Sequence, residues 1–162
     1  LRYSGLRVED AASCAVSRLV DGKLLLYTAK TGQPVYCVLP SMCLQALADV
    51  DRVSDAYWFW TGTGSKDTLA GNYRRMFRGL DIGVENIHPH RFRDTFAVEL
   101  LLSGVPLERV SILLGHSSVK VTEKHYAPWV KARQAQLEAD VRSTWQDDPV
   151  LAADKPKLER VK

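Results

Sequence analysis

Two side chains near the middle of the chain have the spacing of an anion-binding pair. His90 and Arg93 stand three residues apart in the stretch HPHRFRDTF. If a helix begins at Pro89, both lie on one face of its first turn. An imidazole and a guanidinium fork then lie beside free backbone N–H groups and the positive end of the helix dipole, which suits a phosphate group. An ordinary amphipathic helix with a polar N-terminus would give the same pattern.

Four more side chains stand in local settings from which they could join such a site. Arg7 lies at the start of a short predicted helix, and Lys30 lies at the tip of a predicted hairpin. His116 follows a glycine in LLGHSS, and Tyr126 ends the run KVTEKHY. Taken singly, each has an ordinary explanation: an exposed arginine or lysine, a helix-capping cation, or a half-buried aromatic ring.

The composition is that of a globular domain with a slight positive charge. The 162 residues, 46% of them hydrophobic, are enough for one domain with a real core. A net charge of +3 is compatible with nucleic-acid binding without indicating it. Cys14, Cys37 and Cys43 have irregular spacing, which argues against a disulfide framework and a zinc site and for reduced thiols in the cytosol. No membrane-spanning run or signal peptide is visible.

Hydrophobic periodicity and turn residues predict a mainly helical α+β domain with one small sheet. The turn dipeptides Asp21-Gly22 and Thr31-Gly32 predict a three-stranded antiparallel meander over residues 15–40, and an aromatic run suggests a further short strand over 56–60. Ser41 is the expected N-cap of the second helix. The predicted helices cover residues 5–14, 41–50, 68–79, 89–103, 106–114, 118–124 and 128–145.

Four blocks of sequence resemble the catalytic domain of the tyrosine recombinase (phage integrase) family. SGLRVED, AKTGQPV, HRFRDTFA and LLGHSSVKVTEKHY follow one another in the family's order and with its gaps, from about Leu1 to Trp129. Each block alone is a weak match, whereas four in sequence are a specific one. The resemblance implies the family's fold, in which helices pack with a small three-stranded antiparallel sheet.

The resemblance also assigns the six side chains to one catalytic site. Its residues are Arg7, Lys30, His90, Arg93, His116 and Tyr126. The arginines would bind the phosphate, the lysine is the family's hairpin lysine, the histidines are its two active-site histidines, and the tyrosine is the nucleophile. Asp10 takes the acidic supporting position. The sequence departs from the family at Asp94, where a histidine is usual, and at His88, where serine or threonine is usual.

These residue types suit an in-line attack on a DNA phosphodiester. Two arginines can bind the non-bridging oxygens bidentately as charge develops on them. A phenol is weakly nucleophilic at neutral pH, so it needs a base, for which His90 is the candidate. Lys30 could protonate the leaving 5′-oxygen, and His116 could donate a hydrogen bond to the phosphate. No carboxylate cluster implies a metal site, and a phosphotyrosine link would conserve the bond energy without a cofactor.

The expected partner is double-stranded DNA carrying a recombination site. Four further arginines are weaker candidates for backbone contacts, namely Arg74, Arg75, Arg78 and Arg91. The resemblance implies four protomers on two DNA sites, although the isolated domain could be a monomer. It also implies docking of a C-terminal segment on the neighbouring protomer. We expect a cytoplasmic protein, associated with the nucleoid when bound to DNA.

The expected domain organisation is a catalytic domain over residues 1–145 and a tail over 146–162. The tail is polar and interrupted by proline, so it is either disordered or docked on a neighbour. The chain begins at Leu1 rather than methionine, so we expect a fragment from which the family's N-terminal DNA-clamping domain is absent.

Two other functions use the same residues. An accessory factor could hold DNA without cutting it, but a site that has lost its activity commonly lacks a residue needed only for chemistry, and none is missing here. A type IB topoisomerase shares the chemistry and relaxes supercoils alone, but the hairpin lysine and the LLGH block look closer to integrases.

Overall fold

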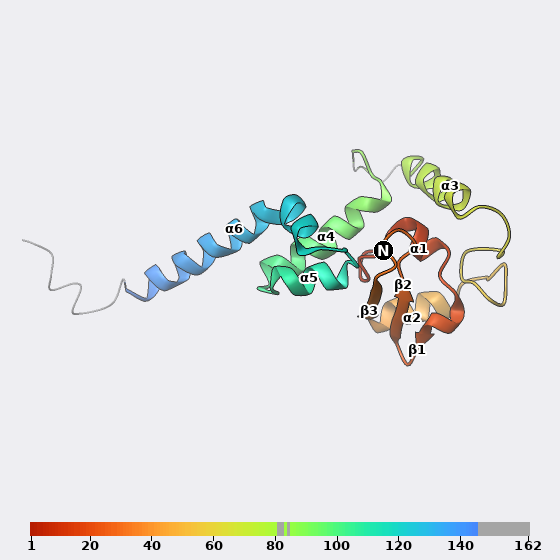
Figure 1. Cartoon of the computed structure of the whole chain (residues 1–162), viewed down its shortest axis with the longest axis horizontal. Helices are drawn as coiled ribbons and strands as arrows, with labels where there is room; N and C mark the ends of the chain where they lie inside the picture. Colours follow the sequence, from red (N-terminus) through yellow and green to blue (C-terminus); the bar gives the residue numbers. More distant parts are fainter. Residues whose placement is uncertain (81–82, 84, 146–162) are drawn as a thin grey trace, which may run out of the picture.

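The computed structural model describes residues 1–80, 83 and 85–145, and it has the predicted class of helices packed with one small sheet (Figure 1). The strands are β1 (Leu19–Val20), β2 (Lys23–Tyr27) and β3 (Pro34–Val38). The helices are α1 (Val8–Ala12), the 3-10 turn η1 (Val16–Arg18), α2 (Ser41–Ala48), α3 (Lys66–Arg78), α4 (Pro89–Leu102), α5 (Leu107–Leu113) and α6 (Val119–Thr144).

The sheet is the antiparallel meander that the turn dipeptides predict, with strand order β1-β2-β3. Leu24 pairs with Cys37 and Leu26 with Val35, and these four side chains are buried while their neighbours along each strand are exposed. Because side chains alternate across a strand, this register places one whole apolar face against the core. Leu6, before α1, and Cys14, after it, belong to the same cluster.

A second core joins the three helices of the C-terminal half. Ala97 and Leu101 of α4 pack with Val110 of α5, with Leu114 and with Tyr126 of α6. The first part of α6 therefore lies against α4 and α5, whereas its far end projects away from the body of the molecule (Figure 1). The hairpin of β2 and β3 and the α5–α6 connection meet between the two cores.

The prediction of two helices around Pro128 is wrong, because α6 runs through this residue without a break. Proline lacks one N–H group, so it forfeits one backbone hydrogen bond, to the carbonyl four residues earlier. The buried side chains of Thr122 and Tyr126 anchor the preceding turns. We attribute the continuity of the helix to this anchoring, which offsets the local cost of the proline.

Four other local predictions differ from the structure, the first of which is α1, predicted over residues 5–14 but observed over Val8–Ala12. Ser41 is the first residue of α2 rather than its N-cap, and the N-cap is Pro40. Helix α3 begins earlier than predicted because Ser65 caps it, accepting a hydrogen bond from the backbone of Asp67 at 3.2 Å. The aromatic run over 56–60 forms only an isolated bridge, between Tyr57 and Ala15, rather than a strand. The predicted tail over 146–162 lies outside the described residues.

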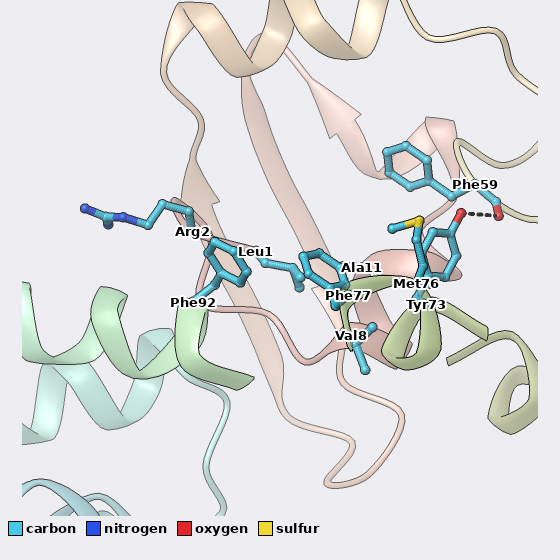
Figure 2. A pocket seen from close by; sticks show the side chains of 10 residues that line it. Leu1, Arg2, Val8, Ala11, Phe59, Tyr73, Met76, Phe77 and Phe92 are labelled. Carbon is cyan, nitrogen blue, oxygen red and sulfur yellow. Dashed lines mark hydrogen bonds between the residues drawn. The ribbon is translucent and has the colours of Figure 1, made fainter. Parts of the chain in front are cut away.

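An apolar cavity of about 360 Å³ is lined by residues of α1, α3 and the start of α4 (Figure 2), and α1 also packs against α3. The rings of Phe77 of α3 and Phe92 of α4 meet edge to face, with centroids 5.6 Å apart. Tyr73 donates a hydrogen bond to the carbonyl of Phe59 at 3.2 Å, which ties α3 to the loop before it. These contacts attach α3 to the body. Within the described part of the chain, no helix combines the length and the apolar character that crossing a membrane would take.

Candidate active site

All six predicted site residues line one cavity of about 1010 Å³. They come from the start of α1, the β2–β3 hairpin, the first turns of α4, the α5–α6 connection and α6, and they are Arg7, Lys30, His90, Arg93, His116 and Tyr126. The two predicted phosphate-binding arginines therefore open into the same space. Arg91 also lines the cavity, whereas the three arginines of α3 are not among its lining residues.

Arg93 is almost fully buried, with 2% of its surface exposed, and it connects three segments. Its guanidinium donates hydrogen bonds to the carbonyl of Gly5 at 2.5 Å and to the carbonyl of Leu114 at 2.8 Å. Burial, and then the positive charge of Arg7, lower the pKa of Arg93 to about 10, so it remains protonated at neutral pH. Arg93 is thus a structural link as well as a candidate phosphate ligand.

Arg7 differs from Arg93 because part of its guanidinium has no partner. It is the N-cap residue of α1, and its Nη1 atom is buried without a hydrogen-bond partner among the described residues. A buried donor in this state costs about 1–3 kcal/mol. An anion in the cavity would remove that cost. Asp10, three residues later, accepts a hydrogen bond from the backbone of Ala29 at 2.7 Å and so fixes the hairpin against α1.

The hairpin that carries Lys30 is also fixed on its other side. The hydroxyl of Thr31 donates a hydrogen bond to the carbonyl of Gly115 at 2.8 Å. Gly115 has φ +61°, and a Cβ atom there would lie 2.7 Å from Cγ2 of Val35 and 2.8 Å from Cγ2 of Thr28. Only glycine allows this close approach. The exposed Lys30 therefore extends from a turn whose flanks are held at the cavity.

His116 accepts a hydrogen bond from Arg93, because arginine can only donate. The Nη2 atom of Arg93 lies 2.9 Å from Nε2 of His116, and Nδ1 of His116 lies 2.8 Å from the hydroxyl oxygen of Thr122. The proton of the neutral ring must then be on Nδ1. Burial, followed by the charge of Arg93, lowers the pKa of His116 to about 4, consistent with a neutral ring. In this state Nε2 accepts, whereas the sequence predicted that it would donate to a phosphate.

Tyr126 is 4% exposed, and its hydroxyl donates a hydrogen bond to Oδ1 of Asp94 at 2.7 Å. Burial, together with the hydrogen bond to Asp94 and the charge of that carboxylate, raises the pKa of Tyr126. Nε2 of His90 lies 3.7 Å from the same carboxylate oxygen. Burial lowers the pKa of His90, and the charge of Asp94 partly opposes this shift. The phenol is therefore protonated and is held by a carboxylate.

Sequence reasoning noticed Asp94 as a departure but missed that it binds the tyrosine, and it missed Thr122 altogether. The sequence did contain an indication of both. Thr122 lies four residues before Tyr126, so a helix places both on one face. Asp94 follows Arg93 directly, at the start of the helix that faces them. Among the described residues, no group of histidine, cysteine and acidic side chains could hold a metal ion.

Comparisons with known proteins bear on the sequence and the fold of the chain. The model of the phage integrase family matches residues 1–133. A tyrosine recombinase of Agathobacter rectalis is 26% identical over 130 residues, covering 74% of this chain and 42% of that protein. The crystal structure of XerA recombinase has a TM-score of 0.62 at 20% identity, covering 87% of this chain and 55% of the other. The structure of XerH site-specific recombinase bound to its difH substrate, in a pre-cleavage complex, has a TM-score of 0.53 at 20% identity, covering 75% and 39%.

Proposed function

Because the chain belongs to the phage integrase family, we propose that it is the catalytic domain of a site-specific DNA recombinase. The chain spans less than half the length of the Agathobacter tyrosine recombinase, so the activity of the whole protein is part of the proposal. The observation that carries it is the single cavity lined by all six predicted residues. Tyr126 would attack a DNA phosphorus, leaving a 3′-phosphotyrosine and a free 5′-hydroxyl. The hydroxyl of a second strand would then reverse the step.

In this proposal the two arginines bind the phosphate in different ways. Arg7 brings a guanidinium nitrogen that is buried without a partner, so a phosphate oxygen would gain a charge-assisted hydrogen bond there. Arg93 is already held by backbone carbonyls and therefore keeps its position as charge develops on the phosphate. Donors fixed before the reaction cost no reorganisation during it, which is why such groups stabilise a transition state strongly.

Lys30 is the candidate donor for the leaving 5′-oxygen. It lies at the exposed tip of the hairpin and lines the cavity, so its ammonium group could reach an oxygen on the far side of the phosphorus from Tyr126. The phosphotyrosine bond would keep the energy of the broken phosphodiester. No nucleotide cofactor is then required for rejoining, and none of the proposed steps uses a metal ion.

The proposed partner is double-stranded DNA, as in the similar XerH complex with its difH substrate. The basic residues outside the catalytic set, on α3 and at Arg91, are proposed to contact the DNA backbone. Assembly of four protomers, with residues 1–145 as the catalytic domain and 146–162 docking on a neighbour, remains part of this proposal. Such an enzyme would act in the cytoplasm, at the nucleoid when bound to DNA. The family match and the complete residue set favour this function over a non-cleaving accessory factor or a type IB topoisomerase.

The test of this proposal is covalent capture on DNA. A nicked duplex carrying the recombination site should trap the wild-type protein as an adduct, and Tyr126→Phe should abolish the adduct while DNA binding persists. Tyr36→Phe is the matched control, because this tyrosine is 51% exposed on β3 and lies outside the cavity. Peptide mass spectrometry should locate the nucleotide on Tyr126. Adducts that persist in Tyr126→Phe would show that the nucleophile is another residue.

A further inference from the structure

We propose that Asp94 is the catalytic residue that takes the proton of Tyr126 during attack on DNA and returns it during rejoining. This inference rests on the proposed function and adds a residue to it. The hydroxyl of Tyr126 donates directly to Oδ1 of Asp94 at 2.7 Å. The base that the sequence suggested, His90, lies 3.7 Å from that same oxygen and forms no described hydrogen bond with the phenol. The carboxylate is therefore the acceptor already in place.

The surrounding structure holds the two groups together. Asp94 follows Arg93 in the first turns of α4, and the burial of Arg93 fixes this part of the helix. Tyr126 lies on α6, one turn after the fully buried Thr122. Helices α4 and α6 pack directly against each other, so the distance between carboxylate and phenol is set by the core. The side chain of Asp94 is still 40% exposed and lines the cavity, so it is accessible where DNA would enter.

The acid–base chemistry of the step is consistent. Before attack, the proton stays on the phenol, because burial and the neighbouring carboxylate raise the pKa of Tyr126. As the bond from its oxygen to phosphorus forms, the phenolic proton becomes far more acidic than the proton of a carboxylic acid. A carboxylate can then accept it. General-base catalysis requires a base whose pKa lies between that of the phenol before attack and that of the phenol as it bonds to phosphorus.

All atoms in the exchange are accounted for. In cleavage, the O–H bond of Tyr126 breaks as its oxygen bonds to phosphorus, and the proton passes to Oδ1 of Asp94. The bond from phosphorus to the 5′-oxygen breaks, and that oxygen takes a proton from the opposite side, where Lys30 is the proposed donor. In rejoining, the attacking 5′-hydroxyl bonds to phosphorus and gives its proton to Lys30, which lost one in cleavage. The bond from phosphorus to the oxygen of Tyr126 breaks, and the protonated Asp94 returns its proton to that oxygen. One carboxyl group thus serves both directions, as microscopic reversibility requires.

The decisive variant is Asp94→Asn, which keeps the shape and can still accept the hydrogen bond but cannot take the proton. The substrate is a nicked duplex recovered from a randomised pool by covalent capture on the wild-type protein. We expect single-turnover cleavage to fall by about 10²- to 10⁴-fold. DNA affinity should be unchanged or higher, because a negative charge has left a phosphate-binding cavity. Asp94→Glu, which restores a carboxylate, should regain part of the rate.

Glu99→Gln is the matched control for the loss of charge. Glu99 lines the same cavity from the same helix, but it pairs with Arg2 and makes no described hydrogen bond to Tyr126. If Asp94→Asn slows cleavage because proton transfer is lost, and not because a negative charge is removed, the cleavage rate of Glu99→Gln should be within about threefold of wild type. Circular dichroism of both variants would show that each is folded.

Two chemical changes in the reactants distinguish the proton transfer at the attacking phenol from the proton transfer at the leaving oxygen. A fluorinated tyrosine at position 126 has a more acidic phenol, so it depends less on a base. It should reduce the difference in cleavage rate between the Asp94→Asn variant and the protein that keeps Asp94. A 5′-bridging phosphorothiolate leaves without a proton, so it should rescue Lys30→Ala and leave Asp94→Asn slow. Rescue of Asp94→Asn by the thiolate would assign Asp94 to the leaving group and overturn the proposal.

Failure of this inference can be told apart from failure of the proposed function. If wild type forms an adduct at Tyr126 but Asp94→Asn cleaves as fast or faster, Asp94 only holds the resting phenol, and the proposed function stands. If wild type forms an adduct at some other residue, both proposals fall.

Discussion

Substituting the two cavity arginines should have opposite consequences for stability, although both should reduce DNA cleavage. Arg93 is 2% exposed and donates to the carbonyls of Gly5 and Leu114. It therefore joins the segment before α1 to the end of α5. Arg7 makes no described hydrogen bond through its buried Nη1 atom, and its charge opposes that of Arg93. The pair separates a structural role from a phosphate-binding role within one cavity.

The magnitude for Arg93→Ala follows from the groups left behind. Each hydrogen bond from a charged donor contributes about 1.5–3 kcal/mol, so loss of the two carbonyl contacts amounts to about 3–6 kcal/mol. Removing a buried charge returns part of its desolvation cost, which reduces the net effect. We expect the free energy of unfolding to fall by about 3 kcal/mol. For a urea dependence of about 2 kcal/mol per molar, the midpoint should fall by about 1.5 M.

Arg7→Ala is the internal comparison. It removes a donor without a described partner and relieves the repulsion between the two guanidinium groups. We therefore expect the free energy of unfolding to rise by about 1 kcal/mol, the low end of the cost of a buried unpaired donor, because the packing of the side chain is lost with it. Cleavage should nevertheless be lost, because Arg7 is the proposed ligand of the phosphate. Arg93→Ala should thus lose both stability and cleavage activity, whereas Arg7→Ala should lose cleavage activity alone.

Urea titration followed by circular dichroism at 222 nm, with wild type and both variants in one buffer, measures the difference. Cleavage of the nicked duplex is measured on the same samples below the unfolding transition. An Arg93→Ala variant destabilised by less than 1 kcal/mol would refute the structural role. A larger loss in Arg7→Ala than in Arg93→Ala would show that the described hydrogen bonds are not what holds these segments together.

Two further predictions concern Gly115 and His116. Gly115→Ala should destabilise the protein by about 2–4 kcal/mol, since it adds overpacking to an unfavourable positive φ, whereas Gly32→Ala, with φ +64° and nothing within 4 Å, should cost about 1–2 kcal/mol in the same urea titration. The lowered pKa of His116, about 4 against 6.5, means that the unfolded chain takes up its proton first, so stability should fall as pH drops from 6.5 towards 4. His116→Gln should make that fall shallower when unfolding is measured at pH 7 and 4.5, and an unchanged pH dependence would contradict the assignment.

The elements that the sequence predicted well are those with local chemical causes. The turn dipeptides Asp21-Gly22 and Thr31-Gly32 lie between the strands of the observed meander, and glycines at 104 and 115 follow the ends of α4 and α5. The failure at Pro128 has the opposite cause. The local geometry of proline predicts a helix start there, but burial of Thr122 and Tyr126 against other helices keeps α6 continuous, and a local sequence pattern does not reveal such burial.

For the site, the sequence predicts which residues take part but not which contacts they make. Its six members could be named because the family's blocks fix their order along the chain, and the cavity brings them together. The sequence could not show that Arg93 donates hydrogen bonds to backbone carbonyls. Every residue has a carbonyl group, so the side chains of Gly5 and Leu114 give no sign of these contacts. Nor could it show which nitrogen of His116 would carry the proton, because that depends on the Arg93 guanidinium lying against Nε2, a contact between segments that are far apart in the sequence.

Asp94 carries this argument furthest. A carboxylate beside a phosphate-binding arginine reads in the sequence as an electrostatic disadvantage, because it repels the phosphate that Arg93 would attract. In the structure its oxygen accepts a hydrogen bond from the phenol of Tyr126. There the negative charge is proposed to accept the phenolic proton as the phenol attacks the phosphate. Of the two residues that depart from the family, Asp94 is then the one whose proposed role depends on a contact between two helices. This explains why sequence comparison alone marks the position as unusual without saying what it does.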